Sequence, residues 1–385
     1  MVKKNKVYLK SFGCQMNMRD SEVICGLLKN AGYKVCASDK DADIIIFNTC
    51  SVRQHAEDRI WSLIGSYKGS KIIGLVGCMA QNYKERAFQR DNSIGFVVGP
   101  QDIEKIPKII SQLLAISGQP SAKSLFERKI WETDGKIRAE EIYHTGFFQD
   151  KKQASVVVSE GCSNFCSYCI VPYVRGPLRH RKHKDILSEI REAVNRGISR
   201  VMLLGQNVNA YQDDGVDFIK LLYEINALEG VEEFDFFTSH PKDAGIGLFK
   251  AIRDLEKSAR HLHLPLQAGS DRILKLMNRG YTVKDYLALI DSYRKIVKDG
   301  LLTTDIIVGF PTETDSEFQA TCDLVRRVKF NAAYIFKYSV RPGTAAADIA
   351  EDLKPEVKEK RHKIILDLQR SISNQLRGSA IDVEN

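Results

Sequence analysis

Hydrophobic and polar positions divide the first 115 residues into short apolar runs that alternate with amphipathic stretches. The apolar runs have the length of buried strands and lie at 6–12, 42–48, 71–77 and 95–99. Between them, helical periodicity predicts helices that include 20–29 and the stretch from Ile106 to Leu113. Strands that alternate with helices predict a parallel sheet with helices on both faces, which is a doubly wound α/β domain over 1–115.

The alternation pauses over 116–150, a polar stretch without a clear period that we expect to be a linker. It then restarts, and six apolar runs predict strands at 155–160, 200–206, 233–239, 261–267, 303–310 and 332–339. A closed barrel of eight βα units usually takes about 250 residues. Six units within 151–345 therefore predict a partial, open (βα)6 barrel, and 346–385 are expected to form a helical tail.

Composition and charge narrow the class of protein only slightly. Of the 385 residues, 43% are hydrophobic and 28% are charged, which is ordinary globular composition. The net charge of +8 suits a nucleic-acid partner but equally suits a generic basic enzyme. No window reaches the ~18 apolar residues of a membrane span, and no signal-peptide core follows the lysine-rich start. We therefore expect a cytoplasmic protein without a membrane partner.

The strongest chemical signal is the nonapeptide GCSNFCSYC at 161–169, which contains Cys162, Cys166 and Cys169. It follows the first strand of the predicted barrel directly, and active sites of such barrels lie at the carboxyl ends of the strands. Three thiolates can bind three irons of a four-iron cluster and leave the fourth iron open for a small molecule. The alternative is a zinc site in which His180 or His183 supplies the fourth ligand.

A second group of cysteines lies in the first domain, where Cys14, Cys50 and Cys78 each follow a predicted strand. Carboxyl ends of parallel strands share one edge of a sheet, so the three thiols can converge there. The alternative is three unrelated buried cysteines. The other three, Cys25, Cys36 and Cys322, lack such placement and are interpreted as small hydrophobic residues.

Several long motifs resemble the methylthiotransferase family of radical S-adenosylmethionine enzymes. The superfamily is indicated by the C-x3-C-x2-C spacing with Tyr168 before the last cysteine. GCQMN at 13–17 and YSVRPGT at 338–344 are similar to the branch that makes 2-methylthio-N6-dimethylallyladenosine in tRNA. The match covers nearly the whole chain, through further motifs at 48–53, 76–81, 160–176, 203–211, 262–282 and 305–314.

This resemblance implies two [4Fe-4S] clusters: one on Cys162, Cys166 and Cys169 that binds S-adenosylmethionine, and an auxiliary one on Cys14, Cys50 and Cys78. It implies methylthiolation of N6-dimethylallyladenosine at position 37 of tRNA, next to the anticodon. One S-adenosylmethionine donates the methyl group and a second is the source of the radical. The implied partners are tRNA, an electron-donor protein and a protein that supplies sulfur or clusters. A monomer is expected, and no catalytic residue beyond the cluster ligands is assigned.

Other activities stay open at this point. The same family includes enzymes that act on threonylcarbamoyl-adenosine in tRNA or on a ribosomal protein, and a non-enzymatic metal-binding RNA protein is a further alternative. The family usually continues into a small RNA-binding β-barrel. The chain ends at Asn385, where that barrel would begin, so the barrel is expected to be absent.

A strip of basic residues follows the radical motif at 175–184. It contains Arg175, Arg179, Arg181, Lys182 and Lys184. Basic side chains next to an active site suit contact with tRNA phosphates. The alternative is a charged, solvated start of a helix.

Overall fold

The computed structural model describes residues 5–51, 54–67, 71–116, 129–135, 137–350 and 352–381, with the backbone alone for 54–56, 116 and 378–381. The chain forms two compact units, each described by itself. The first contains the chain up to Val157 together with Ile170–Pro177 and Ser188–Gly197. The second contains Val158–Cys169, Leu178–Leu187 and the chain from Ile198 onward.

A parallel sheet of six strands organises the first unit, in the order β2-β1-β3-β4-β5-β6. The strands are β1 (Lys6–Ser11), β2 (Lys34–Val35), β3 (Ile44–Thr49), β4 (Ile72–Gly77), β5 (Ile94–Val98) and β6 (Ile130–Glu132). The four strands predicted from apolar runs are confirmed as β1, β3, β4 and β5. Every residue of β3 and β4 is buried, as expected of central strands that are covered on both faces.

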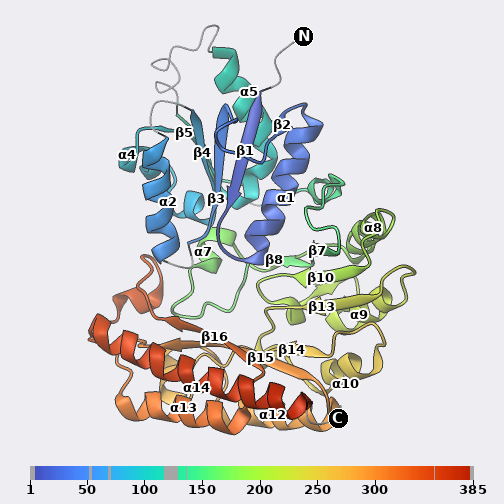
Figure 1. Ribbon diagram of the computed structural model, residues 1–385, viewed down its shortest axis with the longest axis vertical. Coiled ribbons are helices and arrows are strands. Elements are labelled where there is room, and N and C mark those ends of the chain that lie inside the picture. Colours follow the sequence, from blue (N-terminus) through green and yellow to red (C-terminus); the bar gives the residue numbers. More distant parts are fainter. Residues whose placement is uncertain are drawn as a thin grey trace. The chain divides into compact units, whose positions relative to one another are not determined.

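Helices cover both faces of this sheet, so the doubly wound prediction is confirmed. Figure 1 shows α1 (Gln15–Asn30) and α2 (Gln54–Ser66) on opposite sides of the strands. Ile60 and Ile64 of α2 pack on Phe47 and Leu75 in one core cluster. The remaining elements are α3 (Cys78–Tyr83), α4 (Arg86–Arg90), the 3-10 helix η1 (Pro100–Lys105) and α5 (Ile106–Ile116).

Helix α1 begins five residues before the predicted start at Asp20. Its first turns carry buried polar residues, among them Asn17, Arg19 and Glu22, which interrupt the apolar period from which a helix is predicted. Arg19 pairs with Glu22 within the helix, but the other partners of these side chains, among them Thr49 and Glu189, lie far away in the sequence, so no local signal shows that they are buried.

The stretch expected to be a linker contributes structure to the first unit. Within it, β6 pairs with β5 at the edge of the sheet, and η2 (Glu140–His144) buries Ile142 and Tyr143. A strand of three residues with Trp131 exposed is too short to show alternation. Residues 117–128 and 136 of the expected linker lie outside the described residues.

The six strands predicted after residue 150 are all present. The first divides into β7 (Gln153–Val157), in the first unit, and β8 (Ser159–Glu160), which pairs with β9 (Arg179–His180) in the second. In the second unit β10 (Arg200–Leu204) is parallel to β13 (Glu233–Phe236). A further parallel set comprises β14 (His261–His263), β15 (Leu301–Val308) and β16 (Ala332–Lys337).

Helices separate these strands in chain order, as a succession of βα units requires. They are α7 (Val171–Arg175), α8 (His183–Val194), α9 (Phe218–Asn226), α10 (Ile246–Asp254), α11 (Asp271–Leu276), α12 (Val283–Ile296) and α13 (Asp315–Val328). The second unit also contains short elements, namely η3 (Val208–Ala210), η4 (Pro241–Asp243), η5 (Ala345–Asp348) and the hairpin of β11 (Gln212–Asp213) and β12 (Val216–Asp217).

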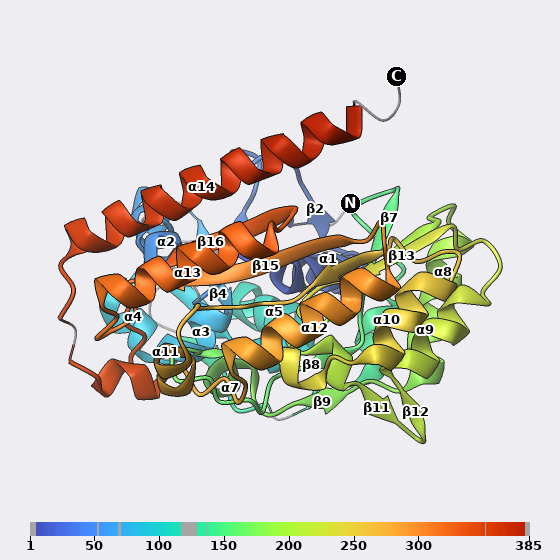
Figure 2. The ribbon, with the colours of Figure 1, turned by 90° about the horizontal axis from the view of Figure 1, so that it is seen from below.

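The C-terminal helix α14 (Pro355–Ile381) packs along α13 and β16, as Figure 2 shows. Ile365 and Ile372 are buried on one face. Arg361 on the same face donates to the carboxylate of Glu313 at 2.8 Å. The expected helical tail is therefore present as a helix that docks through one face.

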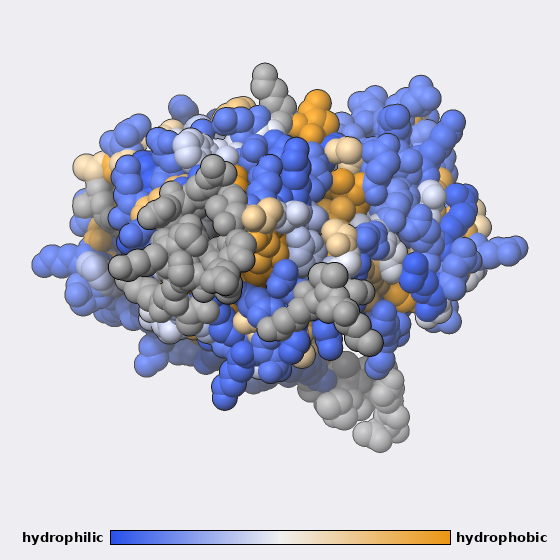
Figure 3. Space-filling view, turned by 90° about the horizontal axis from the view of Figure 1, so that it is seen from above, coloured by the Kyte–Doolittle hydropathy of each residue, from blue (hydrophilic) through white to orange (hydrophobic). Residues whose placement is uncertain are grey.

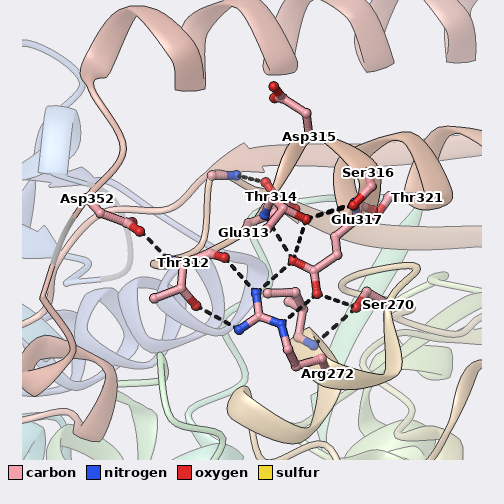
Figure 4. A network of polar contacts seen from close by, with 12 residues as sticks. Ser270, Arg272, Thr312, Glu313, Thr314, Asp315, Ser316, Glu317, Thr321 and Asp352 are labelled. Atoms are coloured by element: carbon pink, nitrogen blue, oxygen red, sulfur yellow. Dashed lines mark hydrogen bonds and ion pairs between the residues drawn. The ribbon is translucent and has the colours of Figure 1, made fainter.

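A polar network holds the loop that joins β15 to α13 (Figure 4). Thr314 caps α13 and forms a capping box with Glu317. Arg272 donates to both carboxylate oxygens of Glu317, at 2.8 and 2.7 Å, and Ser270 donates to one of them at 2.9 Å. The start of α11 and the start of α13 are thus fixed to each other.

The face shown in Figure 3 is mostly hydrophilic with scattered apolar side chains. In the described part of the chain, none of the helices combines the length and the hydropathy that crossing a membrane requires.

Candidate functional site

The three cysteines of the first unit lie at the ends of three neighbouring strands. Ser11 of β1 is paired with Asn48 of β3, and Thr49 of β3 is paired with Gly77 of β4. Cys14, Cys50 and Cys78 therefore follow adjacent strand ends, as the sequence predicts. The loops touch, because a Cβ placed on Gly13 would lie 2.4 Å from the Cβ of Cys50.

Electrostatics confirm that Cys14 and Cys78 are close together. Burial raises the pKa of the Cys78 thiol, the guanidinium of Arg175 opposes this rise, and the thiolate of Cys14 adds to it. Cys50 and Cys78 are buried, whereas Cys14 is exposed. The structure thus gathers the triad at one edge of the sheet with one thiol open to solvent.

Buried amides fix these loops to one another. Asn17 donates to the carbonyl oxygen of Thr49 at 2.8 Å, and Asn48 donates to the carbonyl oxygen of Asn17 at 2.7 Å. Gly77 has φ +88°, and a Cβ there would lie 2.4 Å from Oδ1 of Asn48. Only glycine suits that position, since both the backbone conformation and the close approach exclude a side chain.

A buried arginine that the sequence did not assign to this site contacts the triad. Arg175 donates from Nε to Sγ of Cys78 at 3.2 Å and from Nη2 to the carboxylate of Asp20 at 2.7 Å. The other oxygen of Asp20 accepts from Arg138 at 2.7 Å. Burial alone would raise the pKa of Asp20, but Arg138 and Arg175 together lower it.

A neighbouring ion-pair cluster extends this network. Arg19 donates to Glu22 at 2.9 Å and to Glu189 at 2.7 Å, and both Arg19 and Glu189 are fully buried. Together with Asp20, Arg138 and Arg175, the network holds three arginines and three carboxylates. Its formal charges cancel.

The predicted basic strip is not a continuous exposed surface. Arg175 and Arg181 are buried, and Arg179 donates to Glu160 at 3.2 Å. Only Lys182 and Lys184 of the strip are exposed. The interpretation as a strip of phosphate contacts is therefore wrong for the buried arginines.

The second triad lies on the loop after β8. Cys162 and Cys166 are buried, and Cys169 is half-buried. The backbone N–H of Cys169 donates to the carbonyl oxygen of Cys166 at 2.9 Å. The side chain of Asn278 donates to the carbonyl oxygen of Phe165 at 3.0 Å, and Phe165 itself adopts φ +47°. The loop is thus held in a conformation that a bulky residue rarely adopts.

A buried arginine also contacts this triad. Arg279 donates to Sγ of Cys166 at 3.2 Å, and its other N–H groups donate to the hydroxyl of Tyr281 at 3.1 Å and the carbonyl oxygen of Pro265 at 3.3 Å. Nη1 of Arg279 also lies 3.5 Å from the hydroxyl oxygen of Tyr168. Neither Arg175 nor Arg279 could be assigned from sequence, because the thiols they contact are 97 and 113 residues distant.

Polar atoms at the strand ends of the second unit divide into two kinds. Asn207 donates to Asp243 at 2.8 Å and Asn209 donates to the carbonyl oxygen of His240 at 3.0 Å, so these two hold loops. Oε1 of Gln206 and Oε1 of Gln267 are buried and have no hydrogen-bond partner, and the same is true of Oδ1 of Asn207, whose amide nitrogen alone is bonded. Buried polar atoms rarely stay unpaired, so these oxygens suit the donors of a bound polar molecule.

The histidines His261 and His263 of this unit are held by polar contacts. His261 contacts Asp235 at 2.9 Å and Thr303 at 2.7 Å, and His263 contacts Thr303 at 2.9 Å. Burial, assisted by Arg279 and Lys242, lowers the pKa of His240 to about 2. His240 is therefore neutral near pH 7.

The remaining cysteines are not part of either triad. Cys25 in α1 and Cys322 in α13 are buried, and burial raises the pKa of each thiol to about 11. Cys36 is half-buried. Their interpretation as small hydrophobic residues is in agreement with these positions.

The donor sets suit iron–sulfur clusters better than a single metal ion. Within the described ranges, no three His, Cys, Asp or Glu side chains are arranged to hold one ion. A four-iron cluster binds each thiolate through a different iron, so its ligands need not converge on one point. His183, a candidate zinc ligand, contacts Asp213 at 2.8 Å instead, and His180 packs edge-on against Tyr211. Three clustered thiols without a fourth protein ligand fit a cluster with one open iron.

Comparison with known proteins places the chain in a family. Residues 156–325 match the radical SAM superfamily, and residues 6–99 match the uncharacterized protein family UPF0004. A tRNA-2-methylthio-N(6)-dimethylallyladenosine synthase of Thermoanaerobacter pseudethanolicus is 42% identical over 99% of this chain and 82% of that protein. A synthase of the same name from Thermosipho melanesiensis is 42% identical over 96% of this chain and 84% of that protein.

Solved structures share the fold at low sequence identity. The radical S-adenosylmethionine methyltransferase TsrM from Kitasatospora setae has a TM-score of 0.61 at 14% identity, over 89% of this chain and 74% of that one. The cobalamin-dependent radical enzyme OxsB has a TM-score of 0.55 at 13% identity, over 96% of this chain and 56% of that one. Fold, cysteine loop and superfamily match define a radical S-adenosylmethionine enzyme. Within that class, the chain belongs to the family of tRNA-2-methylthio-N(6)-dimethylallyladenosine synthases.

Proposed function

We propose that this enzyme converts N6-dimethylallyladenosine at position 37 of tRNA, next to the anticodon, to its 2-methylthio derivative. Identities of 40 to 42% to synthases of this name, over 94 to 99% of the chain, support the assignment. The observation that carries it is the additional cysteine triad of the first unit, Cys14, Cys50 and Cys78. An enzyme that only generated a radical would need Cys162, Cys166 and Cys169 but not three more thiols at the edge of another sheet.

The two triads have different roles in this proposal. Cys162, Cys166 and Cys169 hold a [4Fe-4S] cluster that binds S-adenosylmethionine, and Cys14, Cys50 and Cys78 hold an auxiliary [4Fe-4S] cluster. When bound, these groups supply the electron that cleaves S-adenosylmethionine to a radical and the sulfur that is methylated and inserted at C2 of the adenine.

The chain itself supplies position and shielding. The unpaired oxygens of Gln206 and Gln267 accept hydrogen bonds from the polar groups of S-adenosylmethionine. Asn278 and Arg279 keep the cysteine loop in place. Burial of Cys162 and Cys166 keeps water away from a radical that would abstract hydrogen from any nearby donor.

Further partners follow from the same chemistry. The reaction needs a low-potential electron-donor protein and a protein that resupplies sulfur or clusters, in addition to tRNA. We propose that the enzyme works as a monomer in the cytoplasm. Equilibrium sedimentation of the protein, alone and with tRNA, tests the monomer.

Mass spectrometry of tRNA nucleosides tests the function. The cluster-loaded protein is incubated anaerobically with S-adenosylmethionine, a reductant, and tRNA that carries the dimethylallyl group but no methylthio group. The expected products are 2-methylthio-N6-dimethylallyladenosine, 5′-deoxyadenosine and S-adenosylhomocysteine. Cys166→Ala should abolish 5′-deoxyadenosine and the modified nucleoside. Cys14→Ala should keep 5′-deoxyadenosine formation and lose the methylthio product.

Parallel substrates separate the alternatives. Product from tRNA with threonylcarbamoyl-adenosine, or a mass increase on a ribosomal protein, with none on the dimethylallyl substrate, would replace the proposed substrate. A protein that binds RNA and metal but releases no 5′-deoxyadenosine would contradict an enzymatic function. Full product from Cys14→Ala would contradict the two-cluster assignment.

A further inference from the structure

Each cysteine triad has one buried arginine that donates to one of its sulfurs. Arg175 lies 3.2 Å from Sγ of Cys78 in the first unit, and Arg279 lies 3.2 Å from Sγ of Cys166 in the second. Both arginines are at most 5% exposed. The two sites thus share the same kind of charged hydrogen bond to a candidate cluster ligand.

The surroundings of the two arginines differ in charge. Arg175 forms an ion pair with Asp20, inside the balanced network that also contains Arg138. Arg279 donates to tyrosine hydroxyls, a carbonyl oxygen and Cys166. Over the residues that the structure describes, no carboxylate lies within ion-pair distance of its guanidinium. A guanidinium group stays protonated in proteins, so Arg279 carries its positive charge.

Other groups near the second triad do not offset this charge. Burial raises the pKa of the Cys162 thiol, and the positive charges of Lys242 and Arg279 oppose this rise, so Lys242 brings a second positive charge near the triad. His240 is neutral near pH 7. Two cationic side chains, Arg279 and Lys242, therefore act on the second triad, whereas the guanidinium at the first triad is paired with the carboxylate of Asp20.

We propose that Arg279 is a positioning residue that sets the reduction potential of the cluster on Cys162, Cys166 and Cys169, and that its uncompensated charge makes this cluster easier to reduce. Reduction adds one electron from an external low-potential donor and therefore one negative charge to the cluster. A fixed positive charge and a hydrogen bond to a ligand sulfur both stabilise the reduced form. Arg175 provides the hydrogen bond without net charge, so its network changes the potential of the auxiliary cluster less.

This inference rests on the proposed function, which assigns clusters to both triads, and its test separates the two. Protein with Cys14, Cys50 and Cys78 replaced by Ala retains the second triad alone. Its midpoint potential is measured by anaerobic titration followed by electron paramagnetic resonance, without S-adenosylmethionine, so a lost contact to that molecule cannot cause the shift. If this protein assembles no four-iron cluster, the cluster assignment of the proposed function is wrong. If the cluster assembles but its midpoint potential does not change when Arg279 is replaced, only the present inference is contradicted.

In this background, Arg279→Gln should reduce the equilibrium constant for reduction about tenfold, a shift of about 59 mV to lower potential for one electron. Arg279→Lys keeps the charge and should stay within about threefold of the parent. A change below threefold in Arg279→Gln at normal iron content would overturn the proposal. An equal loss in Arg279→Lys would also overturn it, because shape rather than charge would then be responsible. If Arg279→Gln does not load iron, the reduction equilibrium of Arg279→Lys decides whether the proposal is overturned.

A matched experiment on the first triad tests the role of charge balance. Protein with Cys162, Cys166 and Cys169 replaced by Ala retains the auxiliary site alone. The double variant Arg175→Gln with Asp20→Asn removes a positive and a negative charge together. Its cluster should stay within about threefold of the parent reduction equilibrium. A tenfold decrease would show that the hydrogen bond alone sets the potential, and would contradict the role given to charge.

Discussion

Asp20 and Arg175 lie 155 positions apart in the sequence and form a fully buried ion pair with a distance of 2.7 Å. The same carboxylate binds Arg138, so one acidic side chain serves two buried arginines. Replacing Asp20 by Asn leaves both with an unpaired charge. We expect the apo protein to lose about 3–5 kcal/mol of unfolding free energy. Urea unfolding followed by circular dichroism measures this, with exposed Asp41→Asn as the control. A loss below about 1 kcal/mol would show that water reaches the pair.

The same pair predicts a dependence of stability on pH. Burial would raise the pKa of Asp20, but Arg138 and Arg175 lower it below the ordinary 3.8. A carboxyl group with a lowered pKa in the folded state stabilises above its unfolded pKa and loses this effect as the pH falls through the folded pKa. We therefore expect the difference in stability between the parent and Asp20→Asn to be constant from pH 7 to about 5 and to shrink below pH 3.8. A difference that does not shrink there contradicts the assignment.

The close approach of Gly13 to Cys50 allows a test of how tightly the loops of the auxiliary triad pack. It has φ +118°, and a Cβ would lie 2.4 Å from the Cβ of Cys50. Gly13→Ala should displace Cys50 from Cys14 and reduce bound iron by about half, while 5′-deoxyadenosine formation persists. Gly65→Ala is the control, because Gly65 lies in α2 with open space around it. Full iron content in Gly13→Ala would show that the loop accommodates a side chain.

The ion pair between Arg361 and Glu313 is expected to anchor α14. Its contact with Glu313 at 2.8 Å is buried on both sides, and burial raises the pKa of Glu313 in spite of it. Arg361→Met should cost about 3 kcal/mol because an unpaired carboxylate would remain buried. Arg370→Met on the same helix should change stability by less than about 0.5 kcal/mol, since that side chain is 69% exposed. Equal effects of the two variants, measured by urea unfolding, would contradict the anchoring role.

A second dependence of stability on low pH is expected from Glu317. The hydrogen bond from Arg272 is the main reason that its pKa falls to about 2, with Thr314 and Ser270 contributing. Its stabilising effect should therefore be complete above pH 4.5 and lost as the pH falls toward about 2. Glu317→Gln should cost about 1 kcal/mol near pH 7, because it weakens the capping box of α13. If the variant and the parent lose stability in parallel between pH 4.5 and 2, the carboxylate is not the responsible group.

Sequence reasoning succeeded where the signal is local. The buried strands β3 and β4 are continuous apolar runs, and both cysteine triads follow strands that the pattern predicts. It failed where the partner is distant. The polar first turns of α1 are buried because their partners come from residues 100 or more positions away, such as Arg138 and Glu189. Both interpretations of the basic strip, phosphate contacts or a solvated helix start, place Arg175 at the surface, because nothing beside it in the chain reveals Asp20 and Cys78.

The membership of Ile170–Pro177 in the first unit has a consequence for the exchange of modules between relatives. This segment follows the cysteines of the second triad in the chain, yet Ile170 and Val174 pack on Cys78, and Arg175 binds Asp20. A polypeptide that started at residue 151 would retain the loop of the second triad and expose these side chains without their partners. Grafting the second half onto a foreign first half would likewise succeed only if the graft also preserved the residues that receive Ile170–Pro177. An exchange of either half would therefore have to treat Ile170–Pro177 as part of the first unit.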